Sequence, residues 1–293
     1  MKPKLIIHGG AGDRVDSKGQ VAEVQASLHQ IVAEVYALLR EGASAVETVT
    51  IGCKLLEDQP RFNAGTGSVL QSDGQIRMSA SLMDGSSQTF SGVINVSRVQ
   101  NPIELAKFLQ TERDRVLSDL GAAELARELG LPVYQPLTEQ RLQEWLEDRQ
   151  AGSSRKMAAV TRGTIGVVAL DRQGQLCAGT STGGRGFERV GRVSDSATPA
   201  GNYANHAAAV SCTGVGEDIL NETLASKIVV RVTDGMDLNT AIAKSMAEGK
   251  QRVRDFGAIA IDAQGQIGWG KTCPVLFAAY HDGDQLGDTL GLS

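Results

Sequence analysis

Residues 163–180 read GTIGVVALDRQGQLCAGT: an apolar run, a polar turn that contains a glycine, and a second run of small and apolar residues. Two such runs around a short glycine-containing turn are typical of a β-hairpin. Residues 259–267 (IAIDAQGQI) repeat the pattern of residues 168–176 (VALDRQGQL). Two matching hairpins with helical segments between them predict one sheet layout used twice, in an α+β layered domain rather than a solenoid.

Helical patterns flank both hairpins. Ser44 and Glu47 stand in capping-box positions and predict the start of a helix that runs to about Asp58. Apolar periodicity predicts further helices over residues 20–40, 102–130, 138–150, 217–234 and 237–254.

Two further strand signals lie in the first third of the chain. Residues 5–8 predict a buried strand that stops at a glycine loop over residues 9–12. The dipeptide Asp73-Gly74 predicts a hairpin turn between strands over residues 68–70 and 76–78.

Composition excludes several classes of protein. The chain has 293 residues, of which 41% are hydrophobic, so it has enough apolar material for a sizeable core and is not globally disordered. The formal net charge is −5 and no basic stripe occurs, which argues against nucleic acid as a partner. No stretch is long and apolar enough for a membrane span or a signal peptide, so a cytoplasmic protein is expected.

Several familiar motifs are absent from the sequence. The loop at residues 9–12 has Val15 where a dinucleotide fingerprint needs a small residue, so it is interpreted as a turn that gives backbone clearance. The four histidines show no metal-ligand spacing, and no Gly-x-Ser-x-Gly motif occurs. The four cysteines are widely spaced and form no C-x-x-C pair, which favours buried free thiols over a disulfide framework or a zinc site.

The remaining candidates are threonines beside glycines. Taken alone, Thr164 at the start of a strand is far more often a residue of high β-propensity than a nucleophile. A threonine hydroxyl becomes a useful nucleophile when a base lies beside it, and its own α-amine is one such base once the preceding peptide bond is cleaved. That amine has a reference pKa of about 7.7–8.0, so a neutral fraction exists at physiological pH. Residues 151–156 (AGSSRK) are small, polar and basic, and the stretch from 151 to 163 is interpreted as the loose segment that such a cleavage site needs before it.

The same chemistry needs groups that stabilise an oxyanion. Thr213 and the backbone N–H of Gly214 precede a predicted helix and are suited to this task. Arg192 and Asp195, three residues apart, are ambiguous on their own because they are equally compatible with a surface ion pair.

Taken together, these motifs resemble those of plant-type asparaginases and isoaspartyl peptidases, a family of N-terminal nucleophile hydrolases. The similarity covers nearly the whole chain. The matching motifs are residues 7–12 (IHGGAG), 62–67 (FNAGTG), 83–85 (MDG), 163–166 (GTIG), 180–184 (TSTGG), 191–193 (GRV) with 195–196 (DS), and 211–214 (SCTG).

The resemblance implies a fold and a maturation step. The expected fold is α+β, a four-layer αββα sandwich formed by residues 1–293 as one domain. Cleavage between Gly163 and Thr164 would divide the chain into an α-subunit, 1–163, and a β-subunit, 164–293. The partners implied are small molecules, namely asparagine and β-aspartyl dipeptides, together with a second α/β pair in a dimer of pairs.

The resemblance also implies roles for catalytic residues. Thr164 corresponds to the nucleophile, and Thr182 to the hydroxyl that supports it. Thr213 and Gly214 correspond to the oxyanion hole.

Substrate-binding roles follow in the same way. Arg192 would hold the α-carboxylate of the substrate and Asp195 its α-ammonium group, with Thr213, Gly214 and Gly216 also lining the site. An aspartyl unit carries one group of each sign, so an arginine and an aspartate complement both.

No cofactor is expected for catalysis, but the resemblance implies a structural sodium ion. In this family the ion is bound by backbone oxygens of one loop. The matching positions here are Leu56, Glu57, Gln59, Phe62, Ala64 and Thr66.

Two positions depart from the family pattern. Ser79 stands where relatives usually have Asp, and residues 271–276 (KTCPVL) replace an Asn-Thr-x-Gly-Met pattern. One alternative is therefore a non-catalytic relative that binds aspartyl ligands. Another is an enzyme that cleaves glycosylated asparagine, although such enzymes usually have Asp where this chain has Gly163.

Overall fold

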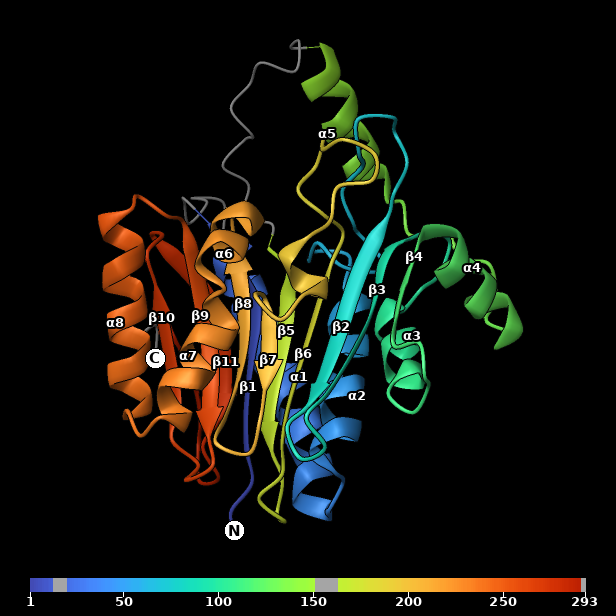
Figure 1. Cartoon of the computed structure of the whole chain (residues 1–293). Coiled ribbons are helices and arrows are strands. Elements are labelled where there is room, and N and C mark those ends of the chain that lie inside the picture. Colours follow the sequence, from blue (N-terminus) through green and yellow to red (C-terminus); the bar gives the residue numbers. More distant parts are fainter. Residues whose placement is uncertain (13–19, 151–162, 291–293) are drawn as a thin grey trace.

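The computed structural model describes residues 1–12, 20–150 and 163–290. Two β-sheets lie face to face, and helices cover their outer faces (Figure 1). This arrangement confirms the predicted α+β class.

The larger sheet has eight strands among the described residues, and the two strands of the first predicted hairpin lie near its centre. The order is β12 (Leu286–Asp288), β11 (Val275–His281), β1 (Lys4–Gly12), β5 (Ile165–Leu170), β6 (Leu176–Thr182), β2 (Met78–Asp84), β3 (Thr89–Val96) and β4 (Val116–Ser118). All neighbours are antiparallel except β3 and β4.

The smaller sheet contains the second predicted hairpin. Its order is β10 (Ile267–Lys271), β9 (Phe256–Asp262), β8 (Ala208–Gly214) and β7 (Asn202–Ala204). Both hairpins form as predicted and in the same register: Leu170 is opposite Leu176, and Ile261 is opposite Ile267.

Helices α1 (Gln20–Glu41), α2 (Ala45–Glu57) and α3 (Pro102–Leu109) pack on the eight-stranded sheet. Helices α7 (Leu224–Thr233) and α8 (Leu238–Gln251) pack on the four-stranded sheet. The capping box of α2 is confirmed, because the Ser44 hydroxyl accepts from the Glu47 N–H while the Ser44 N–H donates to the Glu47 carboxylate. None of the described helices is both long and apolar enough to cross a membrane.

An apolar layer fills the space between the sheets. It includes Ile6, Val168 and Leu170 from the larger sheet and Ile259 and Ile261 from the smaller one, all fully buried. Burying one aliphatic side chain stabilises the fold by about 1.5–3 kcal/mol, so this layer holds the sheets in a fixed relation. All four cysteines are free and buried, as predicted.

The strands predicted over residues 68–70 and 76–78 do not form, except that Met78 begins β2. The turn itself forms, with Gly74 at φ +78° and its N–H donating to the Gln71 carbonyl. The flanking carbonyls bond elsewhere: Leu70 accepts from the Phe187 N–H, and Gln71 also accepts from the Trp145 indole N–H. One bond of the expected pairing remains, from the Gln71 N–H to the Gln75 carbonyl, and partners distant in the sequence replace the rest.

Two predicted helices are interrupted. The helix over residues 217–234 is divided into α6 (Gly216–Glu222) and α7 by Thr223, whose left-handed backbone (φ 46°) ends the first. The segment over residues 102–130 forms α3, strand β4 and helix α4 (Asp119–Glu128), and the last predicted helix before the linker is α5 (Glu139–Gln150).

The strand predicted to stop at residue 8 instead continues through the glycines. β1 extends to Gly12 and has a bulge between His8 and Gly10. A bulge inserts one unpaired residue and bends the strand, and glycine accommodates it readily.

Candidate active site

Thr164 lies immediately before β5 and is buried. Its hydroxyl donates to Oγ1 of Thr182, the last residue of β6, over 3.2 Å. Thr182 Oγ1 also accepts from the Gly184 N–H at 3.1 Å. The hairpin therefore brings the predicted nucleophile and its predicted supporting hydroxyl together, because both lie at its open end.

Gly163 packs directly against the bulge of β1. A Cβ atom added at Gly163 would lie 1.9 Å from the Gly10 Cα atom, which no real side chain tolerates. Gly10 itself has φ +124°. The glycines of residues 9–12 thus provide the backbone clearance that the sequence indicated. The residue that needs this clearance is Gly163, directly before Thr164. The segment over residues 151–162, predicted to be a loose linker, lies outside the described residues.

The predicted substrate-binding pair, Arg192 and Asp195, lies beside α6. Asp195, in a short 3₁₀ turn, is buried, and its Oδ2 atom has no hydrogen-bond partner among the described residues. Burial raises the pKa of Asp195 to about 6, although the charge of Arg192 opposes the shift. A Cβ atom added at Gly216 would lie 2.6 Å from both Arg192 Nη2 and Asp195 Oδ1. Gly216 therefore leaves room where the two charges meet.

Glu217 is a partner of Arg192 that the sequence did not reveal. Its carboxylate accepts from Arg192 Nε at 2.8 Å and from Nη2 at 3.1 Å, and these hydrogen bonds hold the pKa of Glu217 below its usual range. Nη1 of Arg192 makes no hydrogen bond to any described residue. The ion pair thus fixes one edge of the guanidinium and leaves the terminal edge available for an anion. The only available signal was the position of Glu217, directly after Gly216.

The end of β8 has the features expected of an oxyanion hole. Thr213 is fully buried, and its hydroxyl has no partner within the described parts of the chain. The Val215 N–H donates to the Asp255 carbonyl, and Gly214 faces Phe256 of β9. Hydrogen-bonded and non-bonded pairs alternate in an antiparallel ladder, so the Gly214 N–H points away from β9. Gly214 is also exposed, so its N–H is accessible to a ligand.

Two serines near Thr164 were also missed from the sequence. Ser196 Oγ is 3.5 Å from Thr164 Oγ1, and it accepts from Ser194 Oγ at 3.3 Å. The Ser194 hydroxyl also lies 3.2 Å from Asp195 Oδ1. Hydroxyl groups therefore link Thr164 to the buried carboxylate of Asp195, a contact that depends on tertiary packing.

The predicted sodium loop is joined to the site by Asn63. Its carbonyl accepts from the Gly183 N–H at 2.8 Å, and its amide donates to the Gly184 carbonyl at 2.7 Å. Gly183 and Gly184 directly follow Thr182. The loop and the end of β6 are therefore one hydrogen-bonded unit.

The donors of this loop suit an alkali cation. The carbonyls of Leu56, Glu57 and Gln59 already accept backbone N–H groups. The carbonyls of Phe62, Ala64 and Thr66 receive no hydrogen bond from the described residues. Carbonyl oxygens are the donors that hard cations prefer. No group of three or more acidic, histidine or cysteine side chains suited to a metal occurs among the described residues.

The two departures from the family pattern lie behind the site. The Ser79 hydroxyl accepts from the Asn95 N–H, and the Asn95 amide donates to the Arg192 carbonyl. The Thr272 hydroxyl accepts from the Phe256 N–H at 2.8 Å, and Phe256 is the strand partner of Gly214. Both departures therefore contact residues that support the candidate site.

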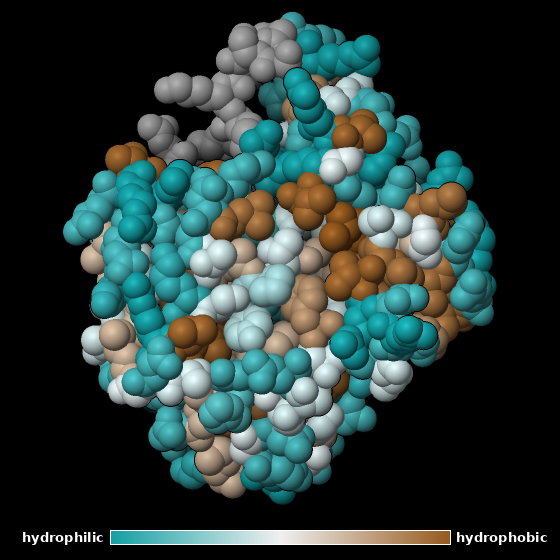
Figure 2. All heavy atoms as spheres, viewed as in Figure 1, coloured by the Kyte–Doolittle hydropathy of each residue, from teal (hydrophilic) through white to brown (hydrophobic). Residues whose placement is uncertain are grey.

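Figure 2 shows pale surface of intermediate hydropathy in the middle of the face viewed, with hydrophobic patches beside it.

Two stacked sheets flanked by helices, with a buried threonine at the start of a central strand, are typical of N-terminal nucleophile hydrolases.

The comparisons with known proteins agree. The family model described as asparaginase matches residues 1–291. The chain belongs to this family.

Relatives resemble the chain over its full length. An isoaspartyl peptidase/L-asparaginase of Nostoc sp. is 63% identical, over 100% of this chain and 96% of the relative. One of Synechocystis sp. is 62% identical, over 100% of this chain and 92% of the relative. One of Homo sapiens is 37% identical, over 89% of this chain and 87% of the relative.

Proposed function

We propose that this chain is an isoaspartyl peptidase and L-asparaginase that hydrolyses L-asparagine and β-aspartyl dipeptides through an acyl-enzyme on Thr164. The observation that carries the proposal is the hydrogen bond from the hydroxyl of Thr164, just before β5, to the hydroxyl of Thr182 at the end of β6. Gly163, the residue before Thr164, packs against Gly10. The names of the close relatives support the same activity.

Cleavage of the bond between Gly163 and Thr164 would activate the nucleophile. It would produce residues 1–163 and 164–293 and give Thr164 a free α-amine. That amine, with a reference pKa of about 7.7–8.0, then takes the hydroxyl proton as the oxygen attacks. Thr182 Oγ1 holds the attacking hydroxyl in position.

Substrate binding follows from the charges beside α6. The terminal edge of Arg192 would bind the α-carboxylate, and the free Oδ2 of Asp195 would bind the α-ammonium group. The side-chain carbonyl carbon of the substrate then lies within reach of Thr164.

The reaction proceeds in two halves. Attack by Thr164 Oγ1 gives a tetrahedral intermediate, whose oxyanion would be stabilised by the Thr213 hydroxyl and the Gly214 N–H. Its collapse releases ammonia or an amino acid, which takes the proton from the Thr164 amine. Water then hydrolyses the ester with the same amine as base, and aspartate leaves.

The family also suggests the wider architecture. The two sheets and their helices would form the four-layer αββα sandwich of N-terminal nucleophile hydrolases, as a single domain. Two cleaved α/β pairs would associate as a dimer of pairs. A sodium ion held by the carbonyls of the 56–66 loop would stabilise the loop that Asn63 joins to the site, and catalysis would need no cofactor.

A denaturing gel and an ammonia assay test this function. Scaling the mass of 30.9 kDa by length predicts fragments of about 17 and 14 kDa. The purified protein should also release ammonia from asparagine and free amino acids from β-aspartyl dipeptides. A chain that stays intact after long incubation and releases neither product would refute the proposal. Binding of aspartate without turnover would instead support the non-catalytic alternative.

A further inference from the structure

The carboxylate of Asp218 closes the ladder between β8 and β9 at the candidate oxyanion hole. In a continued ladder the Asp255 N–H would bond to the carbonyl of Val215, whose own N–H donates to the Asp255 carbonyl at 2.8 Å. Instead the Asp255 N–H donates to Asp218 Oδ2 at 3.1 Å. The Asp218 carboxylate thus replaces the Val215 carbonyl as the acceptor for the Asp255 N–H, at the point where β8 ends and α6 begins.

This exchange lies one residue from Gly214. A Cβ atom added at Gly214 would lie 2.6 Å from both the Asp255 carbonyl oxygen and the Phe256 Cα atom, so the two backbones are in close contact there. The direction of the Gly214 N–H therefore depends on where Asp255 lies. Asp218 is the group that holds Asp255 in place from the α6 side.

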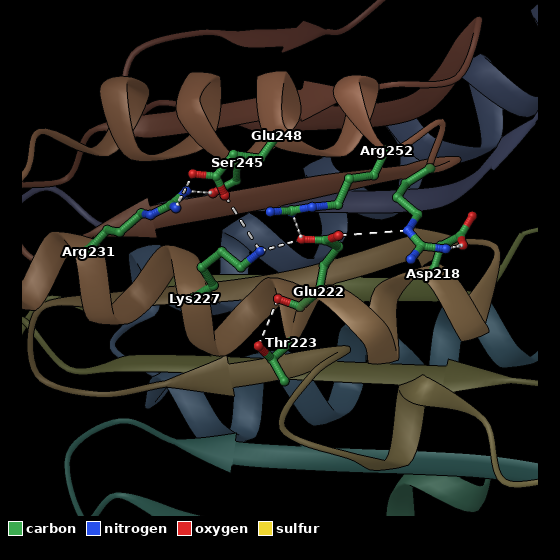
Figure 3. Close-up of polar contacts among 9 residues, drawn as sticks. Asp218, Glu222, Thr223, Lys227, Arg231, Ser245, Glu248 and Arg252 are labelled. Carbon is green, nitrogen blue, oxygen red and sulfur yellow. Dashed lines mark hydrogen bonds and ion pairs between the residues drawn. The ribbon is translucent and has the colours of Figure 1, made fainter.

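Asp218 is itself fixed by a charged network. Its Oδ1 accepts from Arg254 Nη1 at 2.9 Å, and Arg254 Nε lies 3.7 Å from Glu222 Oε1. Glu222 is buried and also binds Lys227 and Arg252. Figure 3 shows Lys227 and Arg252 converging on Glu222, with Asp218 on one side of the network and Glu248 and Arg231 on the other.

We propose that Asp218 is a positioning residue that orients the Gly214 N–H toward the oxyanion, an inference that rests on the proposed function. It contacts no reacting atom and acts through Asp255. Its effect therefore falls on the transition state and leaves binding of the ground-state substrate unchanged.

Asp218→Ala tests the proposal, with Glu248→Gln as the matched control. Glu248 forms an ion pair of the same kind with Arg231, at 2.6 Å, at the other end of the network. Both variants lose a charge from one helical layer, but only Asp218 contacts Asp255. The readouts are kcat and KM for asparagine per mole of chain cleaved before Thr164, the Kd of aspartate, and the Tm.

Asp218→Ala should lower kcat about tenfold, because removing an oxyanion donor outright costs about 10²–10³-fold and this change only misdirects one. KM and the Kd of aspartate should stay within about twofold. Glu248→Gln should keep the wild-type kcat, even where its Tm falls as far.

Asp218→Asn provides a second test if the alanine variant fails to fold. Its amide oxygen still accepts from Asp255 but its nitrogen does not accept from Arg254, so an intermediate kcat is expected. A wild-type kcat in both Asp218 variants, or an equal loss in Glu248→Gln, would overturn the proposal. If the wild-type protein itself lacks turnover, the proposed function fails first, and the two failures are thereby distinguished.

Discussion

The two hairpins, β5–β6 and β9–β10, are built alike and used differently. In each turn an aspartate carboxylate accepts two backbone N–H groups: Asp171 from residues 173 and 175, and Asp262 from residues 264 and 266. The turn glycines, Gly174 and Gly265, share a φ of +83°. With the turns superposed by sequence, Thr164 corresponds to Asp255 and Thr182 to Cys273.

Their surroundings differ. β5 and β6 lie between β1 and β2 in the larger sheet, and every residue of both strands is buried. β10 is an edge strand with Trp269 40% exposed. The same turn sequence thus gives the same turn, while the position in the sheets decides which hairpin is buried.

The strongest test of this difference is removal of the hydroxyl at the open end of the first hairpin. Thr164→Ala should abolish chain cleavage and lower turnover by at least about 10³-fold, because no other group would replace the proposed nucleophile. Thr164→Ser keeps the hydroxyl and should retain both activities at a reduced rate. Mass spectrometry and an ammonia assay measure the two effects. Turnover by Thr164→Ala at the wild-type rate would show that this open end is not the site.

The next comparison is between Thr182 and Cys273, which occupy corresponding positions in the two hairpins. Thr182→Ala should lower kcat about 100-fold, because Thr164 Oγ1 then loses the acceptor that orients it. Cys273→Ala, the same change at the corresponding position, should leave kcat within about twofold. Steady-state kinetics on asparagine measure both variants, and equal losses would remove the distinction between the hairpins.

The pH dependence of kcat/KM tests the role of Asp195, the buried carboxylate near the open end of the β5–β6 hairpin. In the proposed mechanism Asp195 binds the substrate ammonium group as a charged carboxylate, and burial raises the pKa of Asp195 to about 6. Protonation below that pH therefore weakens binding. The α-amine that the proposed cleavage would give Thr164, with a reference pKa of about 7.7–8.0, would also have to be neutral. On a logarithmic plot, kcat/KM should rise with a slope of two below about pH 6 and a slope of one from there to about pH 7.5.

Asp195→Asn is the control for this profile. It should have a low kcat/KM and keep a slope of one throughout, because only the amine still titrates. A slope of two in this variant would assign the lower transition to a different group.

The smallest expected effect concerns the turns themselves. Asp171 is fully buried and also accepts the Ala45 N–H at the start of α2, a third bond at 3.0 Å. Hydrogen bonds to a charged group contribute about 1.5–3 kcal/mol each. In an uncleaved Thr164→Ala background, Asp171→Ala should cost about 2 kcal/mol more in the free energy of unfolding than Asp262→Ala. Urea denaturation measures the difference, and the reverse order would contradict the comparison.

Local signals in the sequence were sufficient for much of the fold. The two Asp-x-x-Gly turns and the capping box of α2 form bonds between near neighbours, so their geometry depends on few residues. The expected strands around Gly74 failed because Leu70 and Gln71 bond to Phe187 and Trp145. No neighbouring residue carries a signal of such distant partners.

The candidate site likewise contains residues that the sequence identified and residues that it did not. Gly163 and Thr164 were singled out as a glycine and a threonine at the start of a predicted strand, and Thr182 from the family resemblance. The structure then brings the three together through one hairpin and one glycine loop. Glu217 and Ser196 were missed, since their contacts with Arg192 and Thr164 exist only once the two sheets are stacked. The sequence offers many equivalent glutamates and serines.

The most direct test of the central claim is the N-terminus of the smaller fragment in active protein. Intact-mass measurement and N-terminal sequencing should find a chain that begins at Thr164, and its appearance should parallel the gain in asparagine hydrolysis. Full activity in an uncleaved chain of 30.9 kDa, or a new terminus at any other residue, would contradict the account.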